Sequence, residues 1–175
     1  MTPLGVAALG LTMVNVGKGG DGHNTLGPRA AIGLSIAPLP LDLNRENKEL
    51  VGLGSYLVNA AGDCNGCHST SEYVTGGNPF LGQPKVIDTT TYLRGGRAFG
   101  PIISRNLLPE APLGHPAGLT YDQFVSAMRH GTDFDNPGQL LQVMPWPTFQ
   151  NMADEDLRAI YHYLQALRPA AAPGD

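Results

Sequence analysis

The stretch Cys64-Asn65-Gly66-Cys67-His68 decides how the rest of this sequence is interpreted. It holds the only two cysteines of the chain, separated by two residues and followed directly by a histidine. Two thiols at this spacing can form thioethers to the two vinyl-derived carbons of one haem, and the histidine then lies under the iron. The pattern therefore predicts one covalent haem c, bound through Cys64 and Cys67, with His68 as the proximal ligand.

Three other uses of two cysteines explain the sequence less well. A structural zinc site needs four ligands, usually from two Cys/His clusters, and the chain has no second cysteine pair. A thioredoxin-like redox pair belongs to a βαβ pattern, whereas the flanks here are helical or rich in glycine. A disulfide across two intervening residues would close almost no loop and would stabilise the fold little.

The composition is that of a small domain with long loops. The chain has 175 residues, a formal net charge of −4, 23 glycines and 15 prolines. This length suffices for one domain with a core, and a haem would supply much of that core if the loops are long. Charged residues make up only 15% of the chain. There is no basic run, which excludes nucleic acid as an expected partner.

The cofactor also predicts where the protein resides. Haem is attached to c-type cytochromes outside the cytoplasm, so we expect an exported protein in the periplasm or the extracellular space. Residues 4–16 are apolar like the core of a signal peptide, but no Lys or Arg precedes them and no clear cleavage site follows. The stretch is too short and too rich in glycine to span a membrane, so we expect no transmembrane segment.

Three regions follow from the distribution of glycine and proline. Residues 1–43 show no helical or strand period, and such a segment cannot form a core of its own. We therefore expect an extended arm that is ordered by packing on a surface, either that of its own domain or that of another subunit. Of these two we predict packing on another subunit, which would support self-assembly. His23 in this arm is interpreted as a surface histidine. Residues 44–170 are expected to form the haem domain, and residues 171–175 a tail.

The first helix of this domain is expected to begin at Asn44 as N-cap and to end at Gly62, leaving the cysteine motif in a loop. Gly52 and Gly54 interrupt its apolar stripe. Glycine is costly inside a helix unless another element approaches closely, so we expect the last helix to cross there. That last helix is predicted for residues 154–168 from its apolar spacing and its acidic first turn.

A shorter helix and a proline-rich segment lie between these two. Thr120-Tyr121-Asp122-Gln123 is a capping box that predicts a helix ending near Gly131. In Gln142-Val143-Met144-Pro145-Trp146-Pro147, two prolines hold Met144 on non-helical backbone. A thioether held in this way suits a second axial ligand of haem iron, although methionine also fills cores, as we expect for Met128. The alternative ligands are His115, His130 and Met152.

Together these features resemble class I cytochromes c. More narrowly, they resemble the haem domains of cytochrome subunits that serve periplasmic alcohol, gluconate and aldehyde dehydrogenases. The similarity extends over about residues 50 to 169. The motifs that carry it, besides the cysteine motif, are Gly54-Ser55-Tyr56-Leu57, Gly100-Pro101-Ile102-Ile103-Ser104-Arg105-Asn106-Leu107-Leu108-Pro109, Phe124 with Arg129-His130-Gly131, Met144-Pro145-Trp146-Pro147 and the last helix.

The resemblance implies a mainly α, class I cytochrome c fold, with helices and long loops wrapped around one haem. It implies covalent attachment through Cys64 and Cys67 and axial ligation by His68 and Met144. Three further residues are implied to line the haem or reach its propionates: Arg105, Asn106 and Trp146. Members of that family often carry three such domains and a membrane anchor, whereas this chain has one haem motif.

With both axial positions filled, the iron can change its oxidation state but does not readily bind a substrate. We therefore expect one-electron transfer between a redox protein donor and acceptor, and not an enzyme. Two alternatives remain open. One is a structural cytochrome that aligns haems in a filament or complex. The other is a peroxidase or gas-binding haem protein, which requires that Met144 leave the sixth position open.

Overall fold

The computed structural model describes residues 26–44 and 46–168. Helices dominate this part of the chain and are joined by long loops, as predicted for a mainly α domain. The strands form two short antiparallel hairpins. In chain order the elements are α1 (Pro28–Ile36), α2 (Lys48–Tyr56), η1 (Leu57–Ala61), α3 (Cys64–Cys67), η2 (Pro79–Leu81), β1 (Ala98–Phe99), β2 (Ile102–Ile103), β3 (Pro109–Glu110), β4 (His115–Pro116), α4 (Tyr121–His130), α5 (Trp146–Phe149) and α6 (Asp154–Ala166).

Helix α2 starts three residues later than predicted. Asn47 is its N-cap, because its side-chain oxygen accepts hydrogen bonds from the backbone N–H groups of Glu49 (2.9 Å) and Leu50 (3.3 Å). Asn44 instead lies in a turn, where its N–H donates to the Asp42 carboxylate (3.1 Å). The helix continues through η1, a single π-helical turn, up to Gly62.

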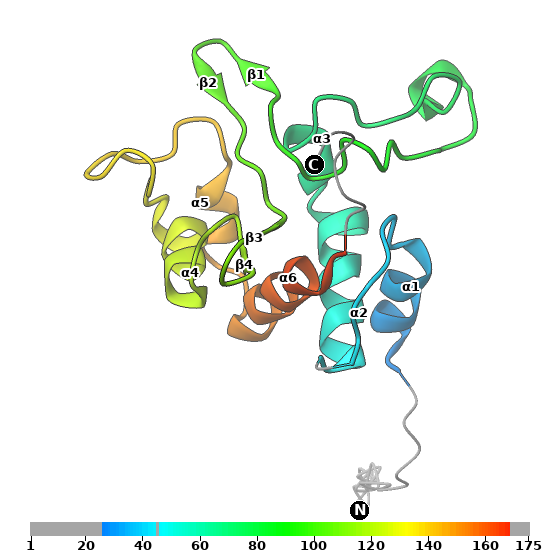
Figure 1. Cartoon of the computed structure of the whole chain (residues 1–175), viewed down its shortest axis with the longest axis horizontal. Coiled ribbons are helices and arrows are strands. Elements are labelled where there is room, and N and C mark those ends of the chain that lie inside the picture. Colours follow the sequence, from blue (N-terminus) through cyan, green and yellow to red (C-terminus); the bar gives the residue numbers. More distant parts are fainter. Residues whose placement is uncertain (1–25, 45, 169–175) are drawn as a thin grey trace, which may run out of the picture.

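The core lies where α6 crosses α2 and η1, between the α1–α2 pair and α4 (Figure 1). Its innermost side chains are fully buried: Val51, Val58, Tyr92, Leu93, Leu157, Tyr163 and Leu164. A Cβ atom on Gly54 would overlap the backbone carbonyl of Ala159 in α6. The predicted crossing of the last helix at Gly54 is therefore confirmed. At Gly52 it is wrong, since this glycine faces the backbone of Ala30 in α1.

Helix α1 corrects the expectation of an extended arm, which is wrong for Pro28–Ile36. Gly33 does not break this helix because it is the contact point: a Cβ atom there would overlap the carbonyl of Gly52. The buried Ser55 hydroxyl also donates to the Gly33 carbonyl (2.6 Å). The helical part of the arm thus packs on α2 of its own domain. Residues 1–25, including His23, lie outside the described residues.

Residues after α1 are tied to the end of α6. The Asp42 N–H donates to the carbonyl of Ala166 (2.8 Å), and the Arg168 N–H donates to that of Pro40 (2.9 Å). The Arg168 guanidinium also pairs with the Asp42 carboxylate at 2.8 Å. These bonds join the first and last described segments of the chain.

Among the described residues, none of the helices has the length and hydropathy needed to span a bilayer.

The predicted capping box of α4 is confirmed. The Thr120 hydroxyl accepts from the Gln123 N–H, and the Gln123 side chain accepts from the Thr120 N–H. The helix ends at Gly131, whose φ of 67° is left-handed. Met128 of α4 is 6% exposed, as expected for a core methionine.

Candidate functional site

The cysteine motif is a helical turn and not the loop that was expected. Asp63 precedes it with a left-handed φ of 46°, and α3 then runs from Cys64 to Cys67. The His68 N–H closes the turn on the Cys64 carbonyl (2.8 Å). Both thiols are free, with Cys64 half-buried and Cys67 exposed. One turn of helix therefore presents two unpaired thiols and ends at the histidine.

The electrostatics of Cys64 suit a neutral thiol. Burial, together with the smaller effect of the negative charge of Asp63, raises the pKa of Cys64 to about 12. A thiolate, the form that binds zinc or attacks a disulfide, is disfavoured at such a pKa. The described part of the chain also contains no cluster of three or more His, Cys, Asp or Glu side chains that could hold a metal ion. The raised pKa weighs against a thiolate nucleophile of the thioredoxin-like kind.

His68 is held in one orientation by a backbone carbonyl. Its Nδ1 lies 2.8 Å from the carbonyl oxygen of Arg105. Because a carbonyl can only accept, Nδ1 carries the proton and Nε2 keeps its lone pair. Burial lowers the pKa of His68, and the hydrogen bond to Arg105 opposes this shift only in part. The result is a neutral imidazole with a free Nε2, which is the form that ligates iron.

Met144 lies half-buried on irregular backbone directly before α5. Its carbonyl accepts from the Trp146 N–H at 2.8 Å. The segment is also fixed at Leu141, whose N–H donates to the Gly131 carbonyl (2.8 Å) and whose carbonyl accepts from the Trp146 indole (3.2 Å). The thioether thus extends from a braced, non-helical segment, which is the placement expected of a loop ligand.

The alternative ligands have other surroundings. His115 points Nδ1 at the Tyr161 hydroxyl (3.3 Å), beside the core. His130 is exposed at the end of α4. Met152 is half-buried, and its carbonyl accepts from Arg129 (2.9 Å).

The polar groups expected at the propionates are engaged by protein in this structure. The Arg105 guanidinium pairs with Asp135 at 2.7 Å. The Asn106 side chain accepts from the Leu108 N–H (3.0 Å), and the Trp146 indole donates to Leu141. Their contact with a haem stays a prediction. Sequence reasoning missed that the Arg105 carbonyl, not its side chain, holds His68. It also missed Arg97, whose Nε donates to the Ser69 carbonyl directly after the motif (2.8 Å).

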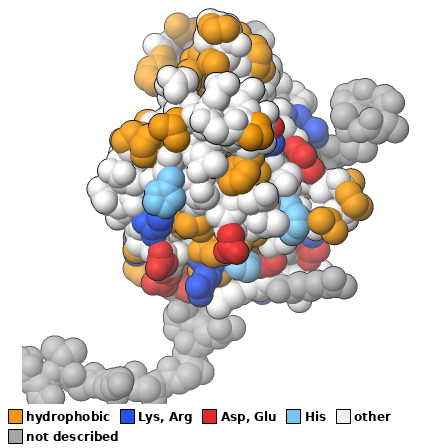
Figure 2. All heavy atoms as spheres, turned by 90° about the vertical axis from the view of Figure 1, so that its left-hand side faces the viewer, with side chains coloured by type: hydrophobic (Ala, Val, Ile, Leu, Met, Phe, Trp, Pro, Cys, Tyr) orange, Lys and Arg blue, Asp and Glu red, His pale blue; other side chains and the backbone are white. Residues whose placement is uncertain are grey.

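Exposed apolar side chains on two loops suit contact with an apolar macrocycle. In the view of Figure 1, α3 and α5 lie on opposite sides of residues 104–108, which supply the carbonyl bonded to His68. Large apolar side chains are exposed on β2 and on the segment before Met144, namely Ile102, Ile103, Leu140 and Val143. Figure 2 shows hydrophobic side chains gathered at the level of the β1–β2 hairpin. Thiols, a free imidazole nitrogen, a thioether and an apolar lining are the groups that a haem c needs.

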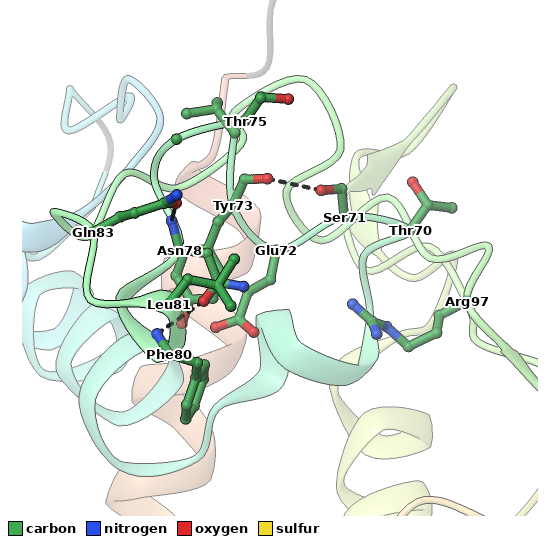
Figure 3. Close-up of a pocket in the computed structure, with 12 residues that line it drawn as sticks. Thr70, Ser71, Glu72, Tyr73, Thr75, Asn78, Phe80, Leu81, Gln83 and Arg97 are labelled. Atoms are coloured by element: carbon green, nitrogen blue, oxygen red, sulfur yellow. Dashed lines mark hydrogen bonds between the residues drawn. The ribbon is translucent and has the colours of Figure 1, made fainter.

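A separate open pocket of about 530 Å³ lies beside the motif. It is lined by residues of the segments 70–76 and 78–83, with Arg97 at one side (Figure 3). None of the predicted site residues lines it. This pocket is therefore distinct from the surroundings of His68 and Met144.

Comparison with known proteins identifies the relatives. The sequence matches no protein-family model. It is 37% identical over 139 residues to the gluconate 2-dehydrogenase cytochrome c subunit of Pantoea cypripedii, covering 79% of this chain and 27% of that subunit. It is 33% identical over 141 residues to the fructose dehydrogenase cytochrome subunit of Gluconobacter japonicus, covering 78% of this chain and 24% of that subunit. The chain is homologous to cytochrome c subunits of dehydrogenases.

The alcohol dehydrogenase (quinone) cytochrome c subunit of Komagataeibacter europaeus is a further relative, 30% identical over 125 residues, with 71% of this chain and 23% of the relative covered. The chain spans about a quarter of the length of the curated relatives it matches. The predicted resemblance is confirmed. The relatives are named as cytochrome subunits of dehydrogenases.

Proposed function

We propose that this cytochrome transfers single electrons through one haem c, attached by Cys64 and Cys67 and ligated by His68 and Met144. The observation that supports this best is the geometry of His68. It directly follows a turn with two free thiols, and its Nδ1–H is bonded to the Arg105 carbonyl at 2.8 Å, so that Nε2 is available. Haem c, when bound, supplies the one-electron redox couple.

The chain's own residues set the conditions for that couple. The carbonyl bonded to Nδ1 fixes the imidazole and strengthens it as a donor. A methionine thioether as second ligand favours reduced iron and raises the reduction potential. The exposed apolar side chains beside Met144 would exclude water from a haem bound against them. With both axial positions taken, the site favours electron transfer over peroxidase or gas-binding chemistry.

The partners are proposed from the relatives. Gluconate, fructose and alcohol dehydrogenases have cytochrome subunits homologous to this chain, so we infer a dehydrogenase subunit as electron donor and another redox protein as acceptor. Such partners dock through small and transient contacts. We place the protein in the periplasm or outside the cell because haem c is attached there. A haem-aligning assembly through residues 1–43 loses part of its basis, since residues 26–43 pack on their own domain.

Substitution of the proposed sixth ligand tests this function. Met144→Ala is expected to keep the haem on a denaturing gel, because both thioethers remain. It should lose the low-spin Met/His spectrum and bind carbon monoxide in the ferrous form. Its reduction potential should fall by part of the range of about 0.8 V that axial ligands span. These are measured by optical spectroscopy and redox titration.

Met152→Ala is the matched control, because Met152 is also half-buried but lies on the other side of α5 in the sequence. It should leave spectrum and potential unchanged. A normal low-spin spectrum and potential in Met144→Ala would show that another residue is the ligand, and His115, His130 and Met152 would be tested next.

A further inference from the structure

Arg105 contacts the proximal side of the site through its backbone. Its carbonyl oxygen accepts the hydrogen bond from His68 Nδ1 at 2.8 Å. The neighbouring Leu107 N–H donates to the Leu93 carbonyl (2.8 Å), and Leu93 is fully buried. The carbonyl that orients the imidazole therefore belongs to a segment anchored in the core.

The side chain of Arg105 contacts the turn that precedes the Met144 segment. The Arg105 guanidinium pairs with Asp135 at 2.7 Å. Asp135 lies in a turn organised by Asp133, whose carboxylate accepts from the N–H groups of Asp135 (2.9 Å) and Asn136 (3.1 Å). This turn closes with a bridge between Thr132 and Leu140.

The turn leads directly to Met144. The turn ends at Leu140, and the next residue, Leu141, is hydrogen-bonded to the Gly131 carbonyl and to the Trp146 indole. The position of Asp135 is therefore coupled, through a hydrogen-bonded turn, to the position of the segment that holds the Met144 thioether. Within residues 46–168, the Arg105–Asp135 ion pair is a side-chain link between the two ligand-bearing segments.

We propose that Arg105 is a positioning residue that couples the two axial ligands, holding His68 by its carbonyl and the Met144 segment by its ion pair with Asp135. This inference rests on the proposed function, in which both residues ligate the iron. It differs from the propionate-binding role expected from the sequence, because here the partner of the guanidinium is Asp135. A charge on Asp135 matters in this arrangement and has no part in the propionate role.

The expected consequence is control over how often the thioether leaves the iron. An external ligand such as imidazole binds only when the Met144 segment opens, so its apparent affinity scales with the open fraction. Loss of the ion pair should raise that fraction. The pair is partly exposed, with 33% of the Arg105 side chain and 60% of the Asp135 side chain accessible. Solvent screening then limits the effect to about two- to fivefold.

The experiment is a titration of the oxidised holoprotein with imidazole. Binding is monitored by the loss of the iron–thioether charge-transfer band. Arg105→Gln and Asp135→Asn are expected to raise the imidazole affinity equally, and the double variant to add nothing. Arg105→Gln keeps the carbonyl bonded to His68, so it removes the ion pair alone. In about 1 M salt the wild-type affinity should approach that of the variants.

The Arg168–Asp42 pair provides the matched control, since it has the same chemistry at 2.8 Å but joins neither ligand segment. Arg168→Gln and Asp42→Asn should leave the imidazole affinity unchanged. Equal affinities in wild type and the Arg105 and Asp135 variants would overturn the coupling, as would an effect of Arg105→Gln without one of Asp135→Asn. If the wild-type protein lacks the iron–thioether band, both the proposed Met144 ligation and the coupling are wrong. If the band is present but the imidazole affinities of wild type and variants are equal, only the coupling is wrong.

Discussion

Gly131 shows how one residue without a side chain shapes the Met144 segment. Its φ of 67° is left-handed, and a Cβ atom there would overlap the Trp146 ring. The ring therefore lies directly against the end of α4. Its indole N–H reaches Leu141, whose own N–H is bonded to the Gly131 carbonyl. Gly131 thus sets the position of the tryptophan that follows the proposed ligand by two residues.

Replacing Gly131 by alanine should disturb both packing and backbone. Gly138 offers a matched control, because its φ of 87° is also left-handed but nothing lies within 4 Å of a Cβ atom there. We expect Gly131→Ala to lower the free energy of unfolding by about 1–3 kcal/mol more than Gly138→Ala, as overpacking does. Denaturant unfolding of the holoproteins measures this difference. Equal losses would show that the Trp146 contact carries no weight.

At the scale of elements, a ring of hydrogen bonds joins η1 to α6. The Tyr92 hydroxyl donates to the Asn59 side-chain oxygen (2.5 Å), and the Asn59 amide donates to the Tyr163 hydroxyl (3.2 Å). The two hydroxyls lie 2.9 Å apart, and with Tyr92 already donating, Tyr163 is the donor between them. The remaining Asn59 proton reaches Ser55. The turn that leads to Cys64 is therefore fastened to the core helix by a closed polar network.

Removing one hydroxyl should break this ring. Tyr163→Phe removes the acceptor of one Asn59 N–H and the donor to the Tyr92 hydroxyl oxygen, in a site that is largely buried. Leaving these groups unpaired costs about 1–3 kcal/mol. Tyr121→Phe is the control, because Tyr121 is half-buried and its described contact is an edge-on ring contact with Tyr161. Its free energy of unfolding should hardly change. Thermal or denaturant unfolding compares the two, and an equally stable Tyr163→Phe would mean that the ring is energetically neutral.

The whole molecule should lose stability in alkali because of the same two tyrosines. Burial is the main cause that raises the pKa of Tyr92 well above 10.0 and that raises the pKa of Tyr163. The folded state keeps these protons while the unfolded chain releases them. The contribution is therefore fully present below about pH 10 and falls as pH rises, by up to about 1.4 kcal/mol per pH unit for each tyrosine.

Denaturant unfolding between about pH 8 and 11 measures how the free energy of unfolding changes with pH. The decline should begin near the unperturbed tyrosine pKa. The slope should be smaller in Tyr92→Phe, which removes one of the two groups. An unchanged slope would show that the alkaline loss comes from other residues.

The N-terminal helix is expected to be part of the stable domain. Deleting residues 1–40 removes α1 from its close contact with Gly52 of α2 and leaves the buried Ser55 hydroxyl without the Gly33 carbonyl. We expect a loss of roughly 3 kcal/mol or more in the free energy of unfolding. Deleting residues 1–25 keeps α1 and is the control, measured by the same denaturant unfolding. Equal stability of the two truncated proteins would contradict the structural role of α1.

What the sequence by itself determined is local. The Cys64 to His68 motif, the capping box at Thr120 and the apolar stripe of α6 each depend on neighbours a few residues apart. Their spacing therefore predicted two helices correctly, and it predicted the haem c that the names of the relatives support. The same local reasoning placed the N-cap of α2 at Asn44, because Asn44 and Asn47 look alike until their hydrogen bonds are seen.

What only the tertiary structure decided depends on distant partners. Gly33 lowers the helix propensity of its own segment, but the close approach of Gly52, 19 residues later in the chain, makes it the contact on which α1 packs. The acceptor of the His68 proton is a backbone carbonyl 37 residues away. Every residue has a carbonyl, so no side-chain pattern could single out Arg105, and only the folded chain brings it to the imidazole.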